Sequence, residues 1–386
     1  MRKEILFFSV FFNLAVLFYY KYANFIVSEF NALFKTNISL AEGVLLPIGI
    51  SYFIFQGMSY VIDMYHRIKL GRDVENSFIK MSGYVSMFPQ LVAGPIVRYE
   101  DIEEDFNVFH YNFENIQEGF SRFIIGLGKK VLIANQVSSF VDEAFLDLSI
   151  IEGSFLSTWI LMLSYTMQIY FDFSGYSDMA IGLGRMIGFQ FNENFLSPYR
   201  SSSIQDFWRR WHISLSTWFR DYLYIPLGGN QKGQGRSFLN LWIVFFLCGL
   251  WHGASWNFVL WGGYHGSFLV LEKLFLHKYL KKISSFSNLY SFVVVLLGWV
   301  LFRSENLKEA MIVYRNLFDL RGFDFVAEIG NSHLFFLAIA LCLSLFVSMR
   351  IQVFFQKSPV FLFFVFVLSM IFLSTNSYNP FIYFRF

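Results

Sequence analysis

The chain has 386 residues, of which 55% are hydrophobic and only 15% charged, and its formal net charge is +2. Soluble domains carry about 25% charged residues, so this composition excludes an ordinary soluble enzyme and predicts a protein surrounded by membrane lipids. The small net charge, without a compact basic domain, argues against nucleic acid as a partner.

Apolar runs recur along the whole chain and predict membrane helices. They lie near residues 5–20, 41–62, 154–171, 238–251, 254–276, 288–302, 333–348 and 358–374. A membrane-spanning helix needs about 20 apolar residues, and the stretches 78–97 and 117–136 are weaker. Pro89 and Pro95, with Gly94, predict that the first of them breaks or re-enters the membrane. We predict an all-α, polytopic membrane protein with roughly eight to eleven membrane helices in a single domain, residues 1–386.

Two carboxylates, Asp172 and Asp178, follow the apolar run at 154–171. They are six residues apart, so they do not share a helical face, and we expect Gly175 to interrupt the helix between them. No His or Cys lies nearby at ligand spacing, so we predict no metal site. We expect Asp172 to contribute to substrate binding.

Small residues at four-residue spacing predict close helix packing at two places. One set is Ala180, Gly184 and Gly188, and the other is Gly249 and Gly253. Small side chains allow another backbone or a ligand to approach a membrane helix closely.

The segment after Ser203 predicts an amphipathic helix. Ser203-Ile-Gln-Asp206 has the pattern of a capping box at a helix N-terminus. Apolar side chains then recur at i, i+3, i+4 and i+7 on one face: Trp208, Trp211, His212, Leu215, Trp218 and Phe219. We expect one helix at the membrane surface with His212 on its buried side. A purely structural role, with His212 anchoring this helix by hydrogen bonds, is the alternative.

The glycine-rich segment 224–236 predicts a turn between this helix and the next membrane helix. It lacks the GxxxxGK[ST] order and no strand precedes it, so a nucleotide-binding loop is not expected. The basic loop 199–236 and the cluster Lys278, Lys281 and Lys282 predict that both regions lie in the cytoplasm. The two apolar runs between them supply the even number of crossings that this requires.

His252 lies within a long apolar region, between Trp251 and Gly253. An ionisable group at membrane depth marks a functional site by default, and a neutral histidine can accept a proton near pH 7. Helix–helix hydrogen bonding is the structural alternative. For His265, thirteen residues further on, we expect a structural role.

Together these segments resemble the membrane-bound O-acyltransferase family, and its alginate O-acetyltransferase branch in particular. The matching pieces are Leu46-Pro-Ile-Gly-Ile-Ser-Tyr-Phe, Tyr60-Val-Ile-Asp-Met-Tyr, Phe88-Pro-Gln-Leu-Val-Ala-Gly-Pro-Ile-Val-Arg98, Asp172-Phe-Ser-Gly-Tyr-Ser-Asp-Met-Ala-Ile-Gly, Asp206-Phe-Trp-Arg-Arg-Trp-His212, Trp218-Phe-Arg-Asp-Tyr-Leu-Tyr-Ile-Pro-Leu-Gly-Gly-Asn230, Trp251-His-Gly and Asn379-Pro-Phe-Ile-Tyr-Phe-Arg-Phe386. Helices that usually precede the segment from Phe7 to Asn24 in this branch are expected to be absent.

The resemblance implies that His252 is the catalytic histidine and His212 the second signature histidine. It also implies transfer of acetyl groups from a thioester donor, with acetyl-CoA expected, toward a secreted or cell-envelope polysaccharide. The acceptor is either the polysaccharide itself or a secreted partner protein that handles the acetyl group. No bound cofactor is predicted, and the implied location is the bacterial cell membrane, crossed several times.

Further residues are expected to bind the substrates. Arg209, Arg210 and Arg220 are predicted to meet the phosphates of coenzyme A, because guanidinium groups bind phosphate well. Trp211, Trp251 and Asn257 complete the predicted substrate-binding set with Asp172. Two alternatives remain open: D-alanyl transfer to teichoic acid from a carrier protein, and transport of a lipid-linked sugar. Inverted repeats, which many transporters show, are not visible.

Overall fold

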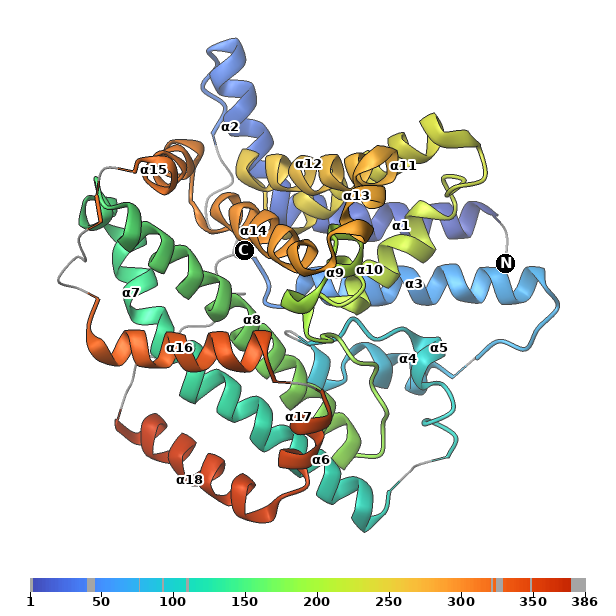
Figure 1. Cartoon of the computed structure of the whole chain (residues 1–386). Helices are drawn as coiled ribbons and strands as arrows, with labels where there is room; N and C mark the ends of the chain where they lie inside the picture. The colour runs from blue at the N-terminus through green and yellow to red at the C-terminus, as the bar shows by residue number, and fades with distance from the viewer. Residues whose placement is uncertain are drawn as a thin grey trace.

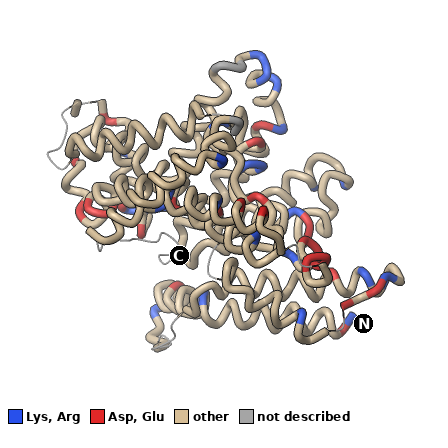
Figure 2. The backbone as a smooth tube through the Cα atoms, turned by 90° about the horizontal axis from the view of Figure 1, so that it is seen from below, with Lys and Arg blue, Asp and Glu red and all other residues tan. Residues whose placement is uncertain are grey.

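The computed structural model describes residues 3–39, 46–75, 77–91, 94–108, 111–320, 322–323, 329–347 and 349–375. All regular elements in these ranges are helical (Figure 1), which confirms the all-α prediction for the described part of the chain. Figure 2 shows long uncharged stretches of helix, with the charged residues gathered in patches between them. Part of the run at 41–62 and the segment from Asn379 to Phe386 lie outside the described residues.

The N-terminal region is one continuous helical stretch. It consists of α1 (Lys3–Leu17), a π-helical turn (Phe18–Tyr22) and α2 (Ala23–Phe34). Helix α3 (Ile50–Lys69) packs along α1, whereas α2 projects away from the rest of the molecule (Figure 1).

The stretch 78–97 is broken, as its prolines predict. Helix α4 (Phe78–Val85) is followed by a short 3₁₀ turn (Phe88–Gln90), extended chain and the one-turn helix α5 (Tyr99–Ile102). The extended part lies against the segment after His212, because the Ile96 N–H donates to the Ser214 hydroxyl at 2.9 Å.

The most extensive helix pair joins residues 113–146 to α8 (Phe155–Met186). The first member comprises α6 (Phe113–Gly128), a π-helical turn (Lys129–Ala134) and α7 (Asn135–Leu146). The expectation that Gly175 ends a helix is wrong, because α8 continues unbroken through it.

Glycines seven residues apart on each helix make this contact close. A Cβ atom on Gly126 would lie 2.5 Å from the Gly175 carbonyl oxygen, and one on Gly182 would lie 2.5 Å from that of Gly119. Two residues of the predicted packing set are tightly packed elsewhere: Ala180 lies close to Gly94, and Gly184 lies against the ring of Phe191. Close backbone approach, not helix breaking, explains Gly175.

The expectation of one continuous helix after Ser203 is also wrong. Helix α9 (Ile204–Trp208) ends before His212, which adopts φ 44° and ψ 55°, and α10 (Ile213–Phe219) begins after it. The capping prediction is confirmed in part: the Asp206 N–H donates to Ser203 Oγ at 3.0 Å. The Asp206 carboxylate accepts from the Ser202 N–H at 3.2 Å instead of from Ser203.

Helices α11 (Gly233–His252) and α12 (Trp256–Leu271) form an antiparallel hairpin. The glycine-rich segment before α11 is a turn, as predicted, with positive φ at Gly228 and Gly229. The Lys273 ammonium donates to Asn230 Oδ1 at 2.6 Å, so the basic loop and the end of α12 lie together.

The C-terminal part is also helical. Its helices are α13 (His277–Lys282), α14 (Ser284–Arg303), α15 (Leu307–Phe318), α16 (Asn331–Leu345), α17 (Met349–Gln356) and α18 (Pro359–Thr375). Among the described residues, Lys3–Phe34 and Phe286–Arg303 are long and apolar enough to cross a membrane, and α16 and α18 are shorter apolar helices. Eight to eleven crossings therefore stay a prediction.

Candidate active site

His212 lies in a left-handed turn held by hydrogen bonds. The Oδ1 atom of Asn194 accepts from the Ser214 N–H at 3.1 Å and from its hydroxyl at 2.9 Å, and lies 3.3 Å from His212 Nδ1. The backbone oxygen of Asn194 accepts from the Ile213 N–H at 3.0 Å. These bonds explain why a non-glycine residue keeps a positive φ here, a conformation that is otherwise unfavourable.

The His212 network assigns a tautomer. Because Asn194 Oδ1 is an acceptor, we assign the ring proton to Nδ1, which leaves a lone pair on Nε2. The ring is fully buried, and Nε2 has no hydrogen-bond partner among the described residues. His212 lies outside the candidate membrane spans, and burial lowers its pKa to about 3, so the ring is neutral near pH 7. Nε2 is therefore a free acceptor.

His252 is the last residue of α11 and lies among aromatic rings. Its ring centroid is 5.0 Å from that of Phe302, 5.1 Å from Trp261 and 6.4 Å from Phe258. The structure gives its imidazole no hydrogen bond to any described side chain or backbone group. Helix–helix hydrogen bonding, the structural alternative for this residue, therefore has no support in the described part of the chain.

Trp251 contacts both histidines. Its ring centroid is 6.1 Å from that of His212 and 4.9 Å from that of His252. Segments 40 residues apart in the sequence thus bring the two signature histidines into one site.

A cavity of about 760 Å³ borders this site. Gly253, which follows His252, and the rings of Phe258 and Phe302, which contact His252, are part of its wall. Lys21 also lines it, and its ammonium donates to the backbone oxygen of Trp251. The cavity offers a path by which a substrate could reach the catalytic candidate.

The three predicted arginines differ in their surroundings, and Arg220 forms an ion pair with Asp221 at 2.7 Å. Arg210 donates to Asp206 at 3.0 Å and to the Leu196 carbonyl oxygen at 3.5 Å. Arg209 is exposed and has no ion pair among the described residues. Arg209 is therefore the better candidate for an external anion.

Three other predicted substrate-binding residues have structural contacts instead. Trp211 is buried among aromatic side chains, including Phe195 at 5.0 Å and Trp299 at 5.0 Å. Asn257 donates to the Ser304 carbonyl oxygen at 2.7 Å. Asp172 forms a buried ion pair with Lys130 at 2.6 Å. These contacts stabilise the fold around the histidines, and a role of the three residues in substrate binding stays a prediction.

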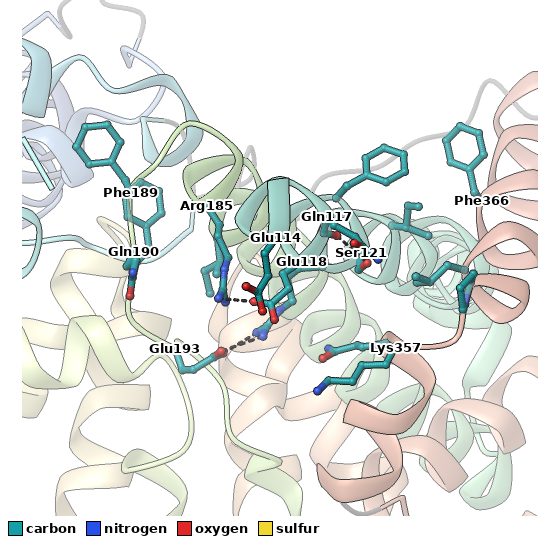
Figure 3. Close-up of a pocket in the computed structure, with 18 of the residues that line it drawn as sticks. Glu114, Gln117, Glu118, Ser121, Arg185, Phe189, Gln190, Glu193, Lys357 and Phe366 are labelled. Atoms are coloured by element: carbon teal, nitrogen blue, oxygen red, sulfur yellow. Dashed lines mark hydrogen bonds and ion pairs between the residues drawn. The ribbon is translucent and has the colours of Figure 1, made fainter. Parts of the chain in front are cut away.

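A second cavity, of about 930 Å³, lies between α6, the end of α8 and α18 (Figure 3). Ion pairs inside it neutralise several of its charges: Arg185 with Glu118, and Arg122 with Glu193 at 2.6 Å. Neither His212 nor His252 lines it. Its described wall also has no ring contact with either histidine, whereas Phe258 and Phe302 of the 760 Å³ cavity contact His252, so we do not assign acyl transfer to this second cavity.

Sequence reasoning missed Asn194, Ser214 and Lys21. The first two carry no signal of their own, because their importance depends on contacts with a segment elsewhere in the chain. Lys21 had a signal: it is a cation near the middle of the apolar stretch Lys3–Phe34. The rule that drew attention to His252 applies to it equally.

Comparison with known proteins agrees with the resemblance. A sequence model of the membrane-bound O-acyltransferase family matches residues 4–307. A probable alginate O-acetylase of Pseudomonas putida is 39% identical over 97% of this chain and 82% of its own length. A probable alginate O-acetylase of Azotobacter vinelandii is 42% identical over 88% of this chain and 67% of its own length. The peptidoglycan O-acetyltransferase of Helicobacter pylori is 38% identical over 80% and 64%.

Proposed function

The chain belongs to the membrane-bound O-acyltransferase family, and from that premise we propose that it passes acetyl groups from a cytoplasmic thioester to a hydroxyl of a cell-envelope polysaccharide. Two relatives are named as acting on alginate and on peptidoglycan, and these names support a cell-envelope polysaccharide as the acceptor. The observation that carries the proposal is the shared site of His212 and His252 beside an open cavity. We also propose that the protein lies in the cell membrane and crosses it several times.

His252 is the general base in this proposal. The acceptor oxygen attacks the thioester carbonyl carbon while its proton passes to the His252 imidazole. The carbon–sulfur bond then breaks, and the proton moves from His252 to the leaving thiolate, so the base is regenerated. An imidazole without hydrogen-bond partners in an apolar site suits this role, because it is available to the incoming hydroxyl.

His212 orients the donor. Its free Nε2 is an acceptor, and the pantetheine arm of coenzyme A carries amide N–H groups. Acetyl-CoA is the proposed donor. A carrier protein presents its thioester on the same pantetheine arm, so contacts with that arm are common to acetyl transfer and D-alanyl transfer. The acyl group that reacts distinguishes the two.

Replacing His212 with Asn tests the orienting role. Asn tolerates a positive φ and can still bond to Asn194, so we expect a folded protein. Without the Nε2 acceptor, an amide N–H of the bound pantetheine arm is buried and unpaired, at a cost of about 1–3 kcal/mol. The KM for acetyl-CoA should therefore rise about 10–100-fold, as measured by release of coenzyme A. An unchanged KM would contradict the role.

Arg209→Glu tests the predicted phosphate contact. Because Arg209 is exposed and unpaired in the described structure, its reversal should raise the KM for acetyl-CoA severalfold and leave kcat nearly unchanged. The effect should shrink at high salt, which screens exposed charges. Lys282→Glu, in the other basic cluster, is the matched control. If the KM for acetyl-CoA rose equally in both variants, the cause would be the surface charge in general and not a contact of Arg209 with the donor.

A further inference from the structure

The second cavity, between α6, the end of α8 and α18, has no part in the mechanism proposed above. Its volume is about 930 Å³, and its wall combines charged groups with aromatic rings. In Figure 3 the charged ends of Glu114, Arg185 and Lys357 lie in the lower half of the view. The rings of Phe189 and Phe366 lie in the upper half. The cavity is therefore amphipathic, with a charged part and an apolar part.

Four of the six ionisable side chains in the described wall neutralise one another. They form two ion pairs: Arg185 with Glu118, and Arg122 with Glu193 at 2.6 Å. Arg122 also contacts Asp178, which lies outside the wall and is paired with Lys129 at 2.6 Å. These four wall charges therefore have protein partners already.

Two wall charges of opposite sign remain, Glu114 and Lys357. Both side chains are exposed, and neither has an ion pair or a side-chain hydrogen bond within the described part of the chain. A ligand that carries both a negative and a positive group would satisfy the two together. A purely anionic ligand would gain the contact with Lys357 but be repelled by Glu114. The charges of the wall therefore favour a zwitterion.

The apolar part of the wall is suited to hydrocarbon chains. Phe120 on α6 is 49% exposed, and Phe363 and Phe366 on α18 are 63% and 37% exposed. Rings exposed on an apolar helix such as α18 are stable where lipid chains cover them. A ligand with a zwitterionic end and apolar chains therefore matches both parts of the cavity.

The position of the cavity along the helices agrees with a lipid headgroup. The glycine contacts between α6 and α8 show that these helices are antiparallel, so the start of α6 meets the end of α8 at the cavity. From the end of α8 the chain leads through an irregular segment to the basic loop 199–236. By the positive-inside rule this loop faces the cytoplasm, so the charged part lies at the level of the headgroups of the cytoplasmic leaflet.

We propose that this cavity binds a phospholipid whose headgroup combines a phosphate with a primary amine, as in phosphatidylethanolamine. The lipid phosphate accepts from the Lys357 ammonium, and the lipid ammonium donates to the Glu114 carboxylate. The acyl chains lie along the exposed rings of α6 and α18, so the bound lipid bridges α18 to the α6–α8 pair. This site is separate from acyl transfer, because neither His212 nor His252 lines the cavity.

Lipid binding to the purified full-length protein in detergent, measured by native mass spectrometry, tests the proposal. The probes are phosphatidylethanolamine, phosphatidylcholine and phosphatidylglycerol with identical acyl chains. Wild type should bind phosphatidylethanolamine about fivefold more tightly than the other two, as expected for one added ion pair near the surface. Glu114→Gln should abolish the preference for phosphatidylethanolamine over phosphatidylcholine, whose quaternary amine has no N–H to donate. Lys357→Gln should weaken binding of all three lipids, because each carries a phosphate.

Two matched variants control for charge outside the cavity. Glu104→Gln and Lys308→Gln each remove an exposed charge that does not line it, and both should bind the lipids as wild type does. Glu114 lies in the first turn of α6, where a carboxylate also stabilises the helix, so the melting temperature without lipid is measured alongside. The headgroup preference should persist in His252→Ala, which makes this test independent of the proposed function.

Three results would overturn the proposal. The first is wild-type binding that does not depend on the headgroup. The second is an unchanged preference in Glu114→Gln with a lower melting temperature, which would show that this carboxylate only supports the start of α6. The third is binding of free phosphoethanolamine, a headgroup without acyl chains, as tightly as the lipid, because the cavity would then take a soluble phosphate ester.

Discussion

His252→Ala is expected to lower kcat for acetyl transfer by about 10²–10⁴-fold, the usual contribution of a general base. The imidazole lies at the end of α11, where Phe258 and Phe302, two residues of the cavity wall, contact its ring. The measurement is release of coenzyme A and label on added polysaccharide, with acetyl-labelled coenzyme A and protein in lipid vesicles. His252→Gln, which keeps a polar side chain of similar length, should lose as much activity as His252→Ala.

A matched control is available in the same aromatic cluster. His265 lies 5.0 Å from Trp261, which also contacts His252, and both of its ring nitrogens lack hydrogen-bond partners in the described structure. His265→Leu removes a buried imidazole without touching the cavity wall, so activity should stay within a few fold. If His252→Ala retained full activity in a folded protein, His252 would not be the base. If both variants lost activity equally, the loss would reflect packing.

The two histidine segments show what sequence reasoning can reach. Burial of His212 and His252 followed from apolar periodicity and hydropathy, and both are confirmed as buried. The break at His212 could not be predicted, because residues 208–219 fit one helical face. The break depends on Asn194, eighteen residues earlier, whose side chain and backbone oxygens take the bonds that a continuous helix would make.

The partners of the predicted binding residues could not be read from the sequence for a related reason. Residue type indicated that Asp172 and Asn257 need polar partners, but it could not say whether those partners are substrates or protein. The structure pairs Asp172 with Lys130 and Asn257 with a backbone oxygen. In an apolar protein such internal pairs are the usual means of satisfying buried polar groups. Gly175 shows the same limit, since only the neighbouring helix reveals that it serves packing.

Gly249 was predicted to allow another backbone to approach α11 closely, and the structure confirms this. A Cβ atom on it would collide with the Phe258 carbonyl oxygen, and one on Gly262 would collide with that of Phe245. Helices α11 and α12 therefore meet backbone to backbone three residues before His252. Because Trp261 contacts His252 from the facing helix, the same contact sets the position of the base.

Gly262→Ala is accordingly expected to impair both stability and catalysis. Overpacking costs about 1–3 kcal/mol, and helix separation would displace His252 from its working position. Because misplacement by 1 Å can cost about 10²-fold in rate, we expect transfer to fall about 10–100-fold together with the melting temperature. Gly263→Ala is the matched control one residue away, since its Cβ would meet only a Trp242 ring atom at 3.4 Å. If both variants had the same transfer rate and melting temperature, the α11–α12 hairpin would accommodate the added methyl group without cost. Its close contact would then not position His252.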